Sequence, residues 1–199
     1  ESAAEREALT KIHEVAARHF LEQLESPAGT RVRQYLLTER GLTDETIATL
    51  QLGYAPPGRD LLRQRLVKEG FSPLQLVTSG LVSRRDDGSE VDRFRNRLMI
   101  PIARDTGPII AFGGRALDAD QQPKYLNSPE TPIYTKSRTL YGLNLTKGDI
   151  RKRNFVMIVE GYFDFAQVYQ TAGLPVVATC GTALTPQQAQ ALHRFATKV

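Results

Sequence analysis

The chain has 199 residues, of which 41% are hydrophobic and 24% charged, ordinary values for one large globular domain or two small ones. A single cysteine, Cys180, excludes an intrachain disulfide. One cysteine and three histidines cannot form a structural zinc site, so we expect no zinc in this chain. No apolar run approaches the ~20 residues that span a bilayer, and the acidic start does not resemble a signal peptide. We therefore expect a cytoplasmic protein without a membrane partner.

The net charge of +4 is unevenly distributed along the chain. Residues 84–153 hold 14 Lys and Arg against 9 Asp and Glu, whereas residues 1–83 hold 10 against 11 and residues 154–199 hold 2 against 2. The positive excess therefore belongs to the middle segment. Such a segment is either a solvated surface or a surface for nucleic acid or nucleotides, and charge alone leaves both interpretations open.

The first 80 residues have the patterns of helices. Over residues 1–25, apolar side chains recur every three or four residues, which predicts one amphipathic helix with a single apolar stripe. The stripe consists of Leu9, Ile12, Ala16, Phe20 and Leu24. Glycine, proline and N-capping residues divide the remainder into four shorter helices. We expect these at 31–40, from Thr43 onward, at 60–69 and at 72–80.

The middle segment changes to the patterns of strands. Residues 93–98 alternate charged with other residues, which predicts a strand with one wet face. This strand should continue, more deeply buried, over 98–102 and return after a turn over 108–112, so that the two form a hairpin. We expect Gly113-Gly114 to follow the returning strand, and residues 124–130 to be irregular.

Basic side chains beside tyrosines are the second feature of the middle segment. Arg93, Arg95 and Arg97 alternate along the predicted strand, so they should share its wet face. Further along come Arg115, Lys124 and Lys136, with Tyr125 and Tyr134 among them. Cations beside aromatic rings suit a single nucleic-acid strand, whose phosphates pair with the cations while its bases stack. The alternative is a strand face and loops that are only solvated.

The sequence from Phe155 to Asp164, FVMIVEGYFD, combines an apolar run with two carboxylates. The run predicts a strand buried on both faces, as in parallel sheets. Glu160 would then lie at the carboxyl end of the strand and Asp164 in the first turn of the next helix, at the edge where α/β sheets bind ligands. Two carboxylates there suit a divalent cation and phosphate chemistry. The alternative is that Glu160 caps the helix and Asp164 only favours its dipole.

A second strand and helix are predicted at 174–179 and from Thr185 to about residue 197. The intervening loop at 180–182 should face the same crevice as Glu160. Its N–H groups could hold phosphate, or the loop could be only a tight connection. A nearby helix start could lower the pKa of Cys180, but the sequence offers it no catalytic partner, so we interpret it as structural. The last two residues, Lys198 and Val199, should approach a third strand.

The chain resembles the catalytic core of bacterial DnaG-type DNA primases. The motifs that carry the resemblance keep their order and spacing from about Val32: VRQYL, ERGL, GYAPPG, RFRNRLMIPI, IIAFGGRAL, PKYLNSPETPIY, KSRTLYGL and VEGYFD. The resemblance implies a basic mixed α+β subdomain over residues 1–150, with a helical start and antiparallel strands. The first two βα units of a TOPRIM domain, a metal-binding α/β module, would follow over residues 151–199.

The resemblance also implies roles for individual residues. Glu160 matches the TOPRIM glutamate, which implies a ligand of Mg²⁺ or Mn²⁺ or a proton acceptor, and Asp164 matches the nearby aspartate, which implies a helper. Nucleotide or template binding is implied for Arg115, Lys124, Tyr125 and Lys136, and we extend this expectation to Arg93, Arg95 and Arg97.

The family's Asp-x-Asp motif, which supplies further metal ligands, should begin just beyond Val199. The resemblance therefore implies a truncated TOPRIM domain and a metal site of which this chain holds only Glu160, with the aspartates missing beyond Val199.

The implied activity is synthesis of short RNA primers on a single-stranded DNA template, with NTPs as substrates and release of pyrophosphate. A replicative helicase and a zinc-binding domain would be partners in the full-length protein, at the bacterial replication fork. One alternative is a catalytically incomplete fragment that only binds single-stranded DNA or nucleotides. Another is a TOPRIM nuclease or topoisomerase, which the FGGR and KYLNSP segments argue against.

Overall fold

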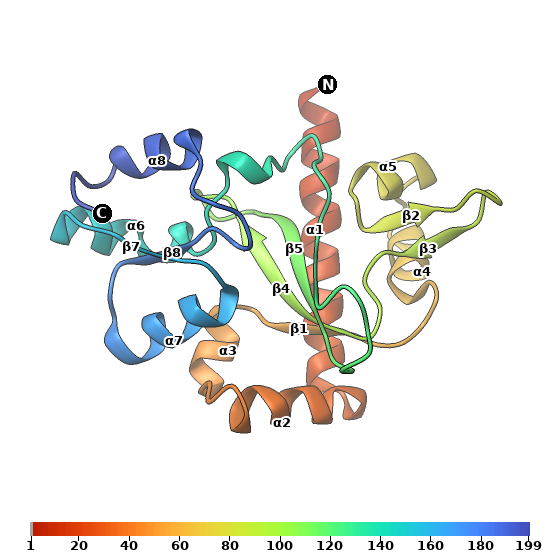
Figure 1. Cartoon of the computed structure of the whole chain (residues 1–199). Coiled ribbons are helices and arrows are strands. Elements are labelled where there is room, and N and C mark those ends of the chain that lie inside the picture. Colours follow the sequence, from red (N-terminus) through yellow and green to blue (C-terminus); the bar gives the residue numbers. More distant parts are fainter. Residues whose placement is uncertain (1) are drawn as a thin grey trace.

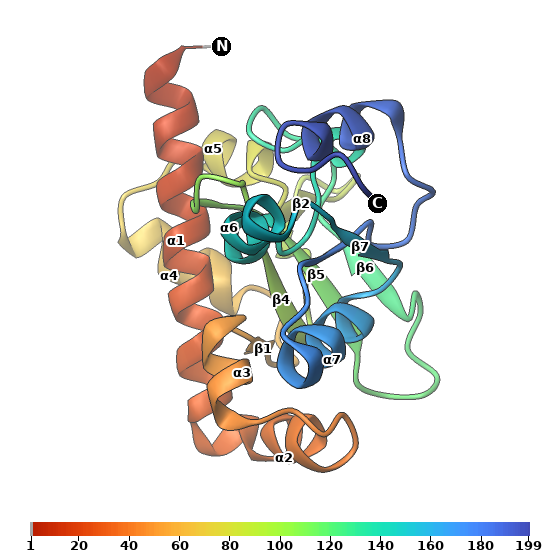
Figure 2. The ribbon, with the colours of Figure 1, turned by 90° about the vertical axis from the view of Figure 1, so that its left-hand side faces the viewer.

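A four-stranded antiparallel sheet lies at the centre of the molecule, and the long helix α1 (Ala3–Glu25) crosses one of its faces (Figures 1 and 2). The computed structural model describes residues 2–199. The strand order is β1-β4-β5-β6. The strands are β1 (Gly53–Ala55), β4 (Arg97–Ala103), β5 (Ile109–Ala116) and β6 (Tyr125–Asn127). Because α1 contacts β1 and β5, the apolar stripe of the helix and one face of the sheet form the main core.

Short elements surround this sheet on two sides (Figure 1). At one end lie η1 (Pro27–Gly29), α2 (Thr30–Thr38) and α3 (Asp44–Thr49). Beside the sheet lie α4 (Leu61–Lys68), α5 (Pro73–Thr78) and the hairpin of β2 (Val82–Arg84) and β3 (Glu90–Asp92). The predicted N-cap at Thr43 is confirmed, because its side chain accepts a hydrogen bond from the third residue of α3. The Ser72 side chain caps α5 in the same way.

The carboxyl-terminal part is built on two parallel strands, β7 and β8. Its elements are η2 (Lys136–Arg138), α6 (Leu143–Arg153), β7 (Met157–Val159), α7 (Tyr162–Ala172), β8 (Val176–Ala178) and α8 (Pro186–His193). The predicted order of strand, helix, strand and helix over 154–199 is confirmed. Lys198 also forms a parallel bridge with Phe155, so the expected approach to a third strand is present.

The predicted apolar stripe of α1 is confirmed, because all five of its members are at most 2% exposed. The predicted hairpin is also confirmed, but β5 continues through Gly113 and Gly114 to Ala116, and the segment expected to be irregular contains β6. Glycine pairs often signal a turn. Here glycine serves instead to admit side chains against the strand, since a Cβ at Gly114 would lie 2.8 Å from the Phe94 ring.

The prediction of a strand at 93–98 is wrong for its first half. Residues 93–96 form no strand, and the backbone at Asn96 is left-handed with φ of 50°, so β4 begins only at Arg97. Asparagine tolerates this conformation better than most residues, which allows the chain to change direction before the strand. The alternating charges were therefore not the sign of one strand face.

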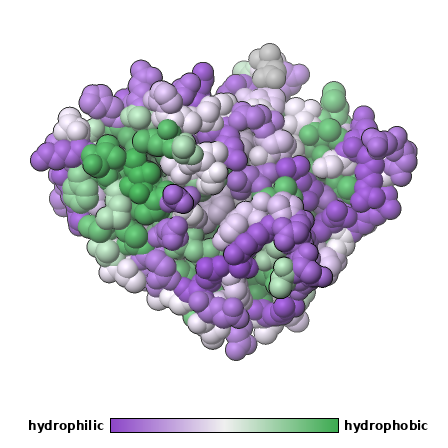
Figure 3. Space-filling model, viewed as in Figure 1, coloured by the Kyte–Doolittle hydropathy of each residue, from purple (hydrophilic) through white to green (hydrophobic). Residues whose placement is uncertain are grey.

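The prediction that the apolar run of β7 is buried on both faces is also wrong. Met157 is 37% exposed and Ile158 is partly exposed, and a broad hydrophobic area lies over this part of the molecule in Figure 3. The fully buried strand is β8, whose Val176 and Val177 belong to two different core clusters. An apolar run indicates that a strand can be buried, but the neighbouring elements decide which strand is.

No helix within residues 2–199 has the length and apolar character needed to cross a membrane.

Helix α1 also buries a histidine in the main core. His13 is 0% exposed, its Nδ1–H donates to the Leu9 carbonyl at 2.8 Å, and its Nε2 has no partner within the described residues. Its ring stacks on Phe112 with centroids 5.8 Å apart. Burial lowers the pKa of His13 from 6.5 to about 4, because the charged form would lose its hydration.

We therefore expect acid to destabilise this chain through His13. The unfolded state takes up a proton below pH 6.5 and the folded state only near pH 4, so the stability linked to this group is complete above pH 6.5 and is lost as the pH falls toward 4. The shift corresponds to about 3 kcal/mol of unfolding free energy at pH 4. His13→Leu should lack this part of the pH dependence in urea unfolding at pH 7, 5.5 and 4.5. Parallel pH curves for the two proteins would contradict the assignment.

Candidate functional site

The turn from β7 into α7 presents one carboxylate to solvent and uses the other for capping. Glu160 is exposed, and its side chain has no hydrogen bond or ion pair within residues 2–199. Asp164 accepts a hydrogen bond from the Gly161 N–H at 3.1 Å, which caps the start of α7. Glu160 is therefore free to bind a ligand, whereas Asp164 already orders the turn that carries it.

After Asp164 the printed sequence contains no further Asp or Glu. Val199 follows the bridge between Lys198 and Phe155, is 80% exposed, and has an apolar side chain that cannot bind a cation. The aspartates that the resemblance places beyond Val199 lie outside the described residues, and their part in the metal site stays a prediction.

The loop after β8 lies beside the Glu160 turn, as the sequence predicted. The Cys180 N–H donates to the Glu160 carbonyl at 2.8 Å, and the Cys180 backbone is left-handed with φ of 57°. Burial raises the pKa of Cys180 to about 12, although a hydrogen bond with Tyr162 acts in the opposite direction. The pKa of Cys180 is therefore raised and not lowered. The thiol stays protonated at neutral pH, which agrees with a structural role.

Tyr162 joins this turn to the central sheet. Its hydroxyl donates to Asn127 Oδ1 in β6 at 2.7 Å. Asn127 in turn donates through Nδ2 to the Cys180 carbonyl at 3.5 Å and accepts at its own carbonyl from the Arg93 guanidinium at 2.9 Å. Asn127 therefore contacts the loop after β8, helix α7 and an arginine of the basic segment.

Space for the Tyr162 ring exists because β5 has a glycine at the point of contact. A Cβ at Gly113 would lie 2.5 Å from the Tyr162 hydroxyl oxygen, closer than atoms approach without displacement. The ring is 5% exposed and packs edge-on against Tyr141, with centroids 5.0 Å apart, and near Tyr125 at 6.2 Å. This aromatic contact fixes how the Glu160 turn lies on the sheet.

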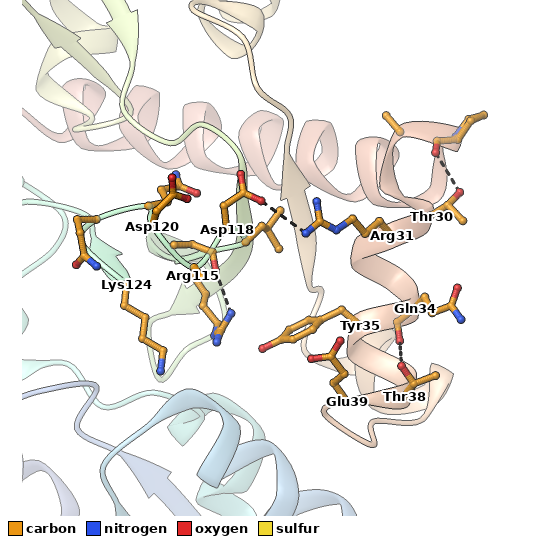
Figure 4. Close-up of a pocket in the computed structure, with 17 residues that line it drawn as sticks. Thr30, Arg31, Gln34, Tyr35, Thr38, Glu39, Arg115, Asp118, Asp120 and Lys124 are labelled. Carbon is orange, nitrogen blue, oxygen red and sulfur yellow. Dashed lines mark hydrogen bonds and ion pairs between the residues drawn. The ribbon is translucent and has the colours of Figure 1, made fainter.

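A cavity of about 1260 Å³ lies between α2 and the loop that joins β5 to β6 (Figure 4). Arg115 and Lys124 both line it and point in the same direction in Figure 4. The Arg115 guanidinium lies 5.2 Å from the centroid of the Tyr35 ring and 6.0 Å from that of Tyr125, and it donates to the Ala116 carbonyl at 2.9 Å. The aromatic rings hold this cation in place while leaving part of its donor fork unused.

Arg40 is a residue of the site that the sequence reasoning missed. Its guanidinium lies 4.1 Å from the centroid of the Phe163 ring in α7, and its Nε–H donates to the Tyr35 hydroxyl at 2.6 Å. Side chains of α7 reach the same place, since Gln170 donates to the Gly41 carbonyl at 2.9 Å. The ERGL motif contains Arg40 and was the available signal, but nothing in the local sequence shows that α7 packs there.

Arg93, Arg95 and Arg97 do not share one wet face, which corrects the sequence prediction. Arg97 is 3% exposed and donates to the carbonyls of Gly114 at 3.2 Å and Pro123 at 2.7 Å, and Arg93 is half-buried. Burial lowers the pKa of both side chains. Carbonyl acceptors make such burial tolerable for an arginine. All three nevertheless line one cavity of about 630 Å³, together with Arg59 and Arg85.

Lys136 and Tyr134 lie apart from the α2 cavity. Lys136 is in η2, where its backbone N–H donates to Glu130, and its charge slightly favours the thiolate of Cys180. Tyr134 is 3% exposed, so its ring is not available to stack on a base. The structure therefore brings Arg115, Lys124 and Tyr125 together and leaves Lys136 on a neighbouring segment.

Fold and site together define a mixed α/β protein in which a basic antiparallel sheet is joined to a parallel unit with an exposed, unpartnered carboxylate. Residues 19–147 match the family model "DNA primase catalytic core, N-terminal domain", and residues 154–199 match "Toprim domain". The chain belongs to the family of bacterial DnaG-type DNA primases.

Curated relatives and solved structures agree with this family. The chain is 40% identical over 190 residues to a DNA primase of Listeria monocytogenes and 44% identical over 192 residues to one of Synechocystis, covering 94% and 96% of this chain. It spans about 30% of the length of either relative. Its fold matches the RNA polymerase domain of Mycobacterium tuberculosis primase DnaG, with a TM-score of 0.89, 35% identity, and coverage of 96% of this chain and 62% of that one.

A DnaG primase catalytic domain bound to single-stranded DNA is similarly close. The TM-score is 0.90 and the identity 38%, with coverage of 100% of this chain and 63% of that one. The recognised family and the expected mixed α/β fold with a TOPRIM unit are therefore confirmed.

The contact between Gly113 and Tyr162 can be tested by unfolding. We expect Gly113→Ala to lower the unfolding free energy by about 1–3 kcal/mol, because the added methyl displaces the Tyr162 ring. Once the ring is gone, the methyl should be tolerated, so the double variant Gly113→Ala/Tyr162→Ala should be no less stable than Tyr162→Ala.

Gly148→Ala is the matched control for that series. Nothing lies within 4 Å of a Cβ at Gly148, in the middle of α6, so this change should be neutral or stabilising by up to about 1 kcal/mol. Urea unfolding followed by circular dichroism measures all four variants. Equal losses for Gly113→Ala and Gly148→Ala would show that the Tyr162 contact is not the cause.

Proposed function

We propose that this chain binds the single-stranded DNA template and incoming NTPs and carries part of the active site for RNA primer synthesis. The observation that carries the proposal is the joining of the free Glu160 carboxylate to the basic sheet through Tyr162 and Asn127. In the reaction, a 3′-hydroxyl attacks the α-phosphate of an NTP, the new phosphodiester bond forms and pyrophosphate leaves. Catalysis of this kind depends on position and charge stabilisation.

The carboxylates of the β7–α7 turn fit a hard divalent cation, Mg²⁺ or Mn²⁺, that would also be bound by substrate phosphates and water. Within residues 2–199, no three His, Cys, Asp or Glu side chains are grouped as a metal site. Glu160 would therefore supply the direct ligand from this chain, and Asp164 would keep the turn in place through its cap at Gly161. When bound, the metal would neutralise charge that develops on the transferred phosphate.

The cations divide into two proposed groups. Arg115 and Lys124 in the α2 cavity would neutralise the triphosphate, with the Tyr125 ring beside the Arg115 guanidinium. Lys136 on η2 would contact nucleotide or template from outside this cavity. Arg93, Arg95 and Arg97 line the second cavity and would contact the template backbone. Of these three, Arg95 is exposed and best placed to bind phosphate, because Arg93 and Arg97 already donate to carbonyl groups.

A boundary at residue 150 between the basic subdomain and the TOPRIM unit stays a prediction. The packing of helix α6 favours a boundary earlier in the chain. The second core cluster combines Leu140, Leu143 and Ile150 with Val156 and Val177 of the parallel unit. Helix α6 thus packs with the TOPRIM strands, so we propose a boundary near residue 140.

Family membership disfavours the TOPRIM nuclease and topoisomerase alternatives. We propose that the longer protein acts in the bacterial cytoplasm at replication forks, with a zinc-binding domain and the replicative helicase as partners.

Binding of single-stranded DNA tests the proposed basic surface. A fluorescent oligodeoxythymidylate should bind with an affinity that falls with salt, with a slope of log affinity against log salt of about −0.7 for each phosphate contacted. Arg115→Ala/Lys124→Ala should weaken binding and make the slope shallower. The exposed pair Arg18→Ala/Arg153→Ala, which lines none of the cavities described here, is the control of equal charge. An affinity that does not change with salt concentration would contradict the proposal.

Binding of ATP with and without Mg²⁺ tests the two carboxylates separately. We expect Glu160→Gln to reduce the Mg²⁺-dependent gain in ATP affinity at least fivefold without lowering stability, because the carboxylate has no partner in the described part of the fold. Asp164→Asn should instead lower the unfolding free energy by about 1 kcal/mol through its cap. Calorimetric titration and urea unfolding measure the two effects. An unchanged Mg²⁺ gain in Glu160→Gln would remove Glu160 from the proposed site.

A further inference from the structure

A second group of arginines surrounds a concavity at the other end of the molecule from α2. The cavity has a volume of about 300 Å³ and is lined by arginines from four separate parts of the chain. These are Arg6 of α1, Arg104 of the β4–β5 turn, Arg138 of η2 and Arg194 at the end of α8. We call it the arginine pocket. It shares no lining residue with the α2 cavity, and α8 and the start of α1 lie opposite α2 in Figure 1.

The positive charge of the arginine pocket is not neutralised within the described residues. None of the four arginines forms an ion pair in residues 2–199. Asp105 is the single carboxylate among the lining residues. Lys147 adds another cation close by, since its ammonium donates to the Asp105 carbonyl at 2.7 Å. Like charges gathered in a concavity raise the local potential and attract anions.

The surroundings of these cations suit phosphate. Arg104 is half-buried and makes one long hydrogen bond of 3.5 Å to the Ile133 carbonyl, which leaves other N–H groups of the guanidinium unused. Thr135 also lines the pocket and brings a hydroxyl group, whereas the hydroxyl of the neighbouring Thr139 already donates to the Thr135 carbonyl at 2.8 Å. Guanidinium forks match the oxygen atoms of phosphate in pairs, better than lysine does.

We propose that the arginine pocket binds phosphate groups, supplied by a nucleic-acid backbone or by a free nucleoside polyphosphate. The four arginines approach from different elements, so they can contact several oxygens of one polyanion at once. The pocket does not include Glu160 or any residue proposed above for the template or the triphosphate, so the inference does not depend on that proposed function.

The test uses the whole chain, labelled with ¹⁵N, and two probes without metal: inorganic tripolyphosphate and an oligodeoxythymidylate. We expect backbone amide shifts over residues 133–140 and 191–194, and at least fivefold weaker binding at this location in Arg138→Ala/Arg194→Ala. Both side chains are exposed and have no hydrogen-bond or ion-pair partner in the described residues, so the fold should persist, which the amide spectrum itself reports.

Matched variants separate a site from general attraction. Arg18→Ala/Arg153→Ala removes the same charge elsewhere and should change binding less than twofold, and Arg115→Ala/Lys124→Ala should leave the shifts at 133–140 intact. If only tripolyphosphate shifts these residues, the ligand is a free polyphosphate. If both probes shift them, the pocket also binds the nucleic-acid backbone. The proposal is wrong if neither probe shifts these residues. It is also wrong if Arg18→Ala/Arg153→Ala weakens binding as much as Arg138→Ala/Arg194→Ala does.

Discussion

The packing of Tyr162 against Gly113 is the contact on which the geometry of the site depends. Glu160 lies on a turn between a short strand and a helix, and neither element alone fixes its direction relative to the basic sheet. The tyrosine ring supplies that constraint, because it fits only where β5 lacks a side chain, and its hydroxyl reaches Asn127 in β6. A buried aromatic ring with a satisfied hydroxyl adds apolar contact and direction at once.

The arginines of the molecule differ in how much of their charge remains available. Arg97 is buried among carbonyl groups and stabilises the approach of the β5–β6 connection to the sheet. Arg115 and Arg40 lie against tyrosine and phenylalanine rings, which hold a guanidinium without consuming its hydrogen-bond donors. Arg138 and Arg194 have no hydrogen-bond or ion-pair partner in the described residues. The arginines therefore differ as phosphate ligands, because only donors that the fold does not use can bind phosphate.

Local patterns predicted those features that nearby residues determine. The predictions of the α1 stripe, of the N-caps at Thr43 and Thr185, and of the order of strands and helices after residue 154 are correct, since periodicity and capping act within a few residues. Apart from the start of β4, which the left-handed backbone of Asn96 delays, the errors concerned contacts between residues far apart in the sequence. From the sequence alone, the two glycines of β5 indicate the end of a strand, because the sequence does not show that Tyr162 packs there from 49 residues away.

By itself the sequence determined the family, the two carboxylates near the end of β7 and the basic middle segment, because motifs and charges are properties of the chain. Only the tertiary structure decided which of them act together. It separated Glu160 from Asp164 by giving the latter a capping hydrogen bond, buried Arg97, and added Arg40 through its contact with Phe163. The physical reason is that availability depends on burial and on competing partners, and both are set by packing between distant segments.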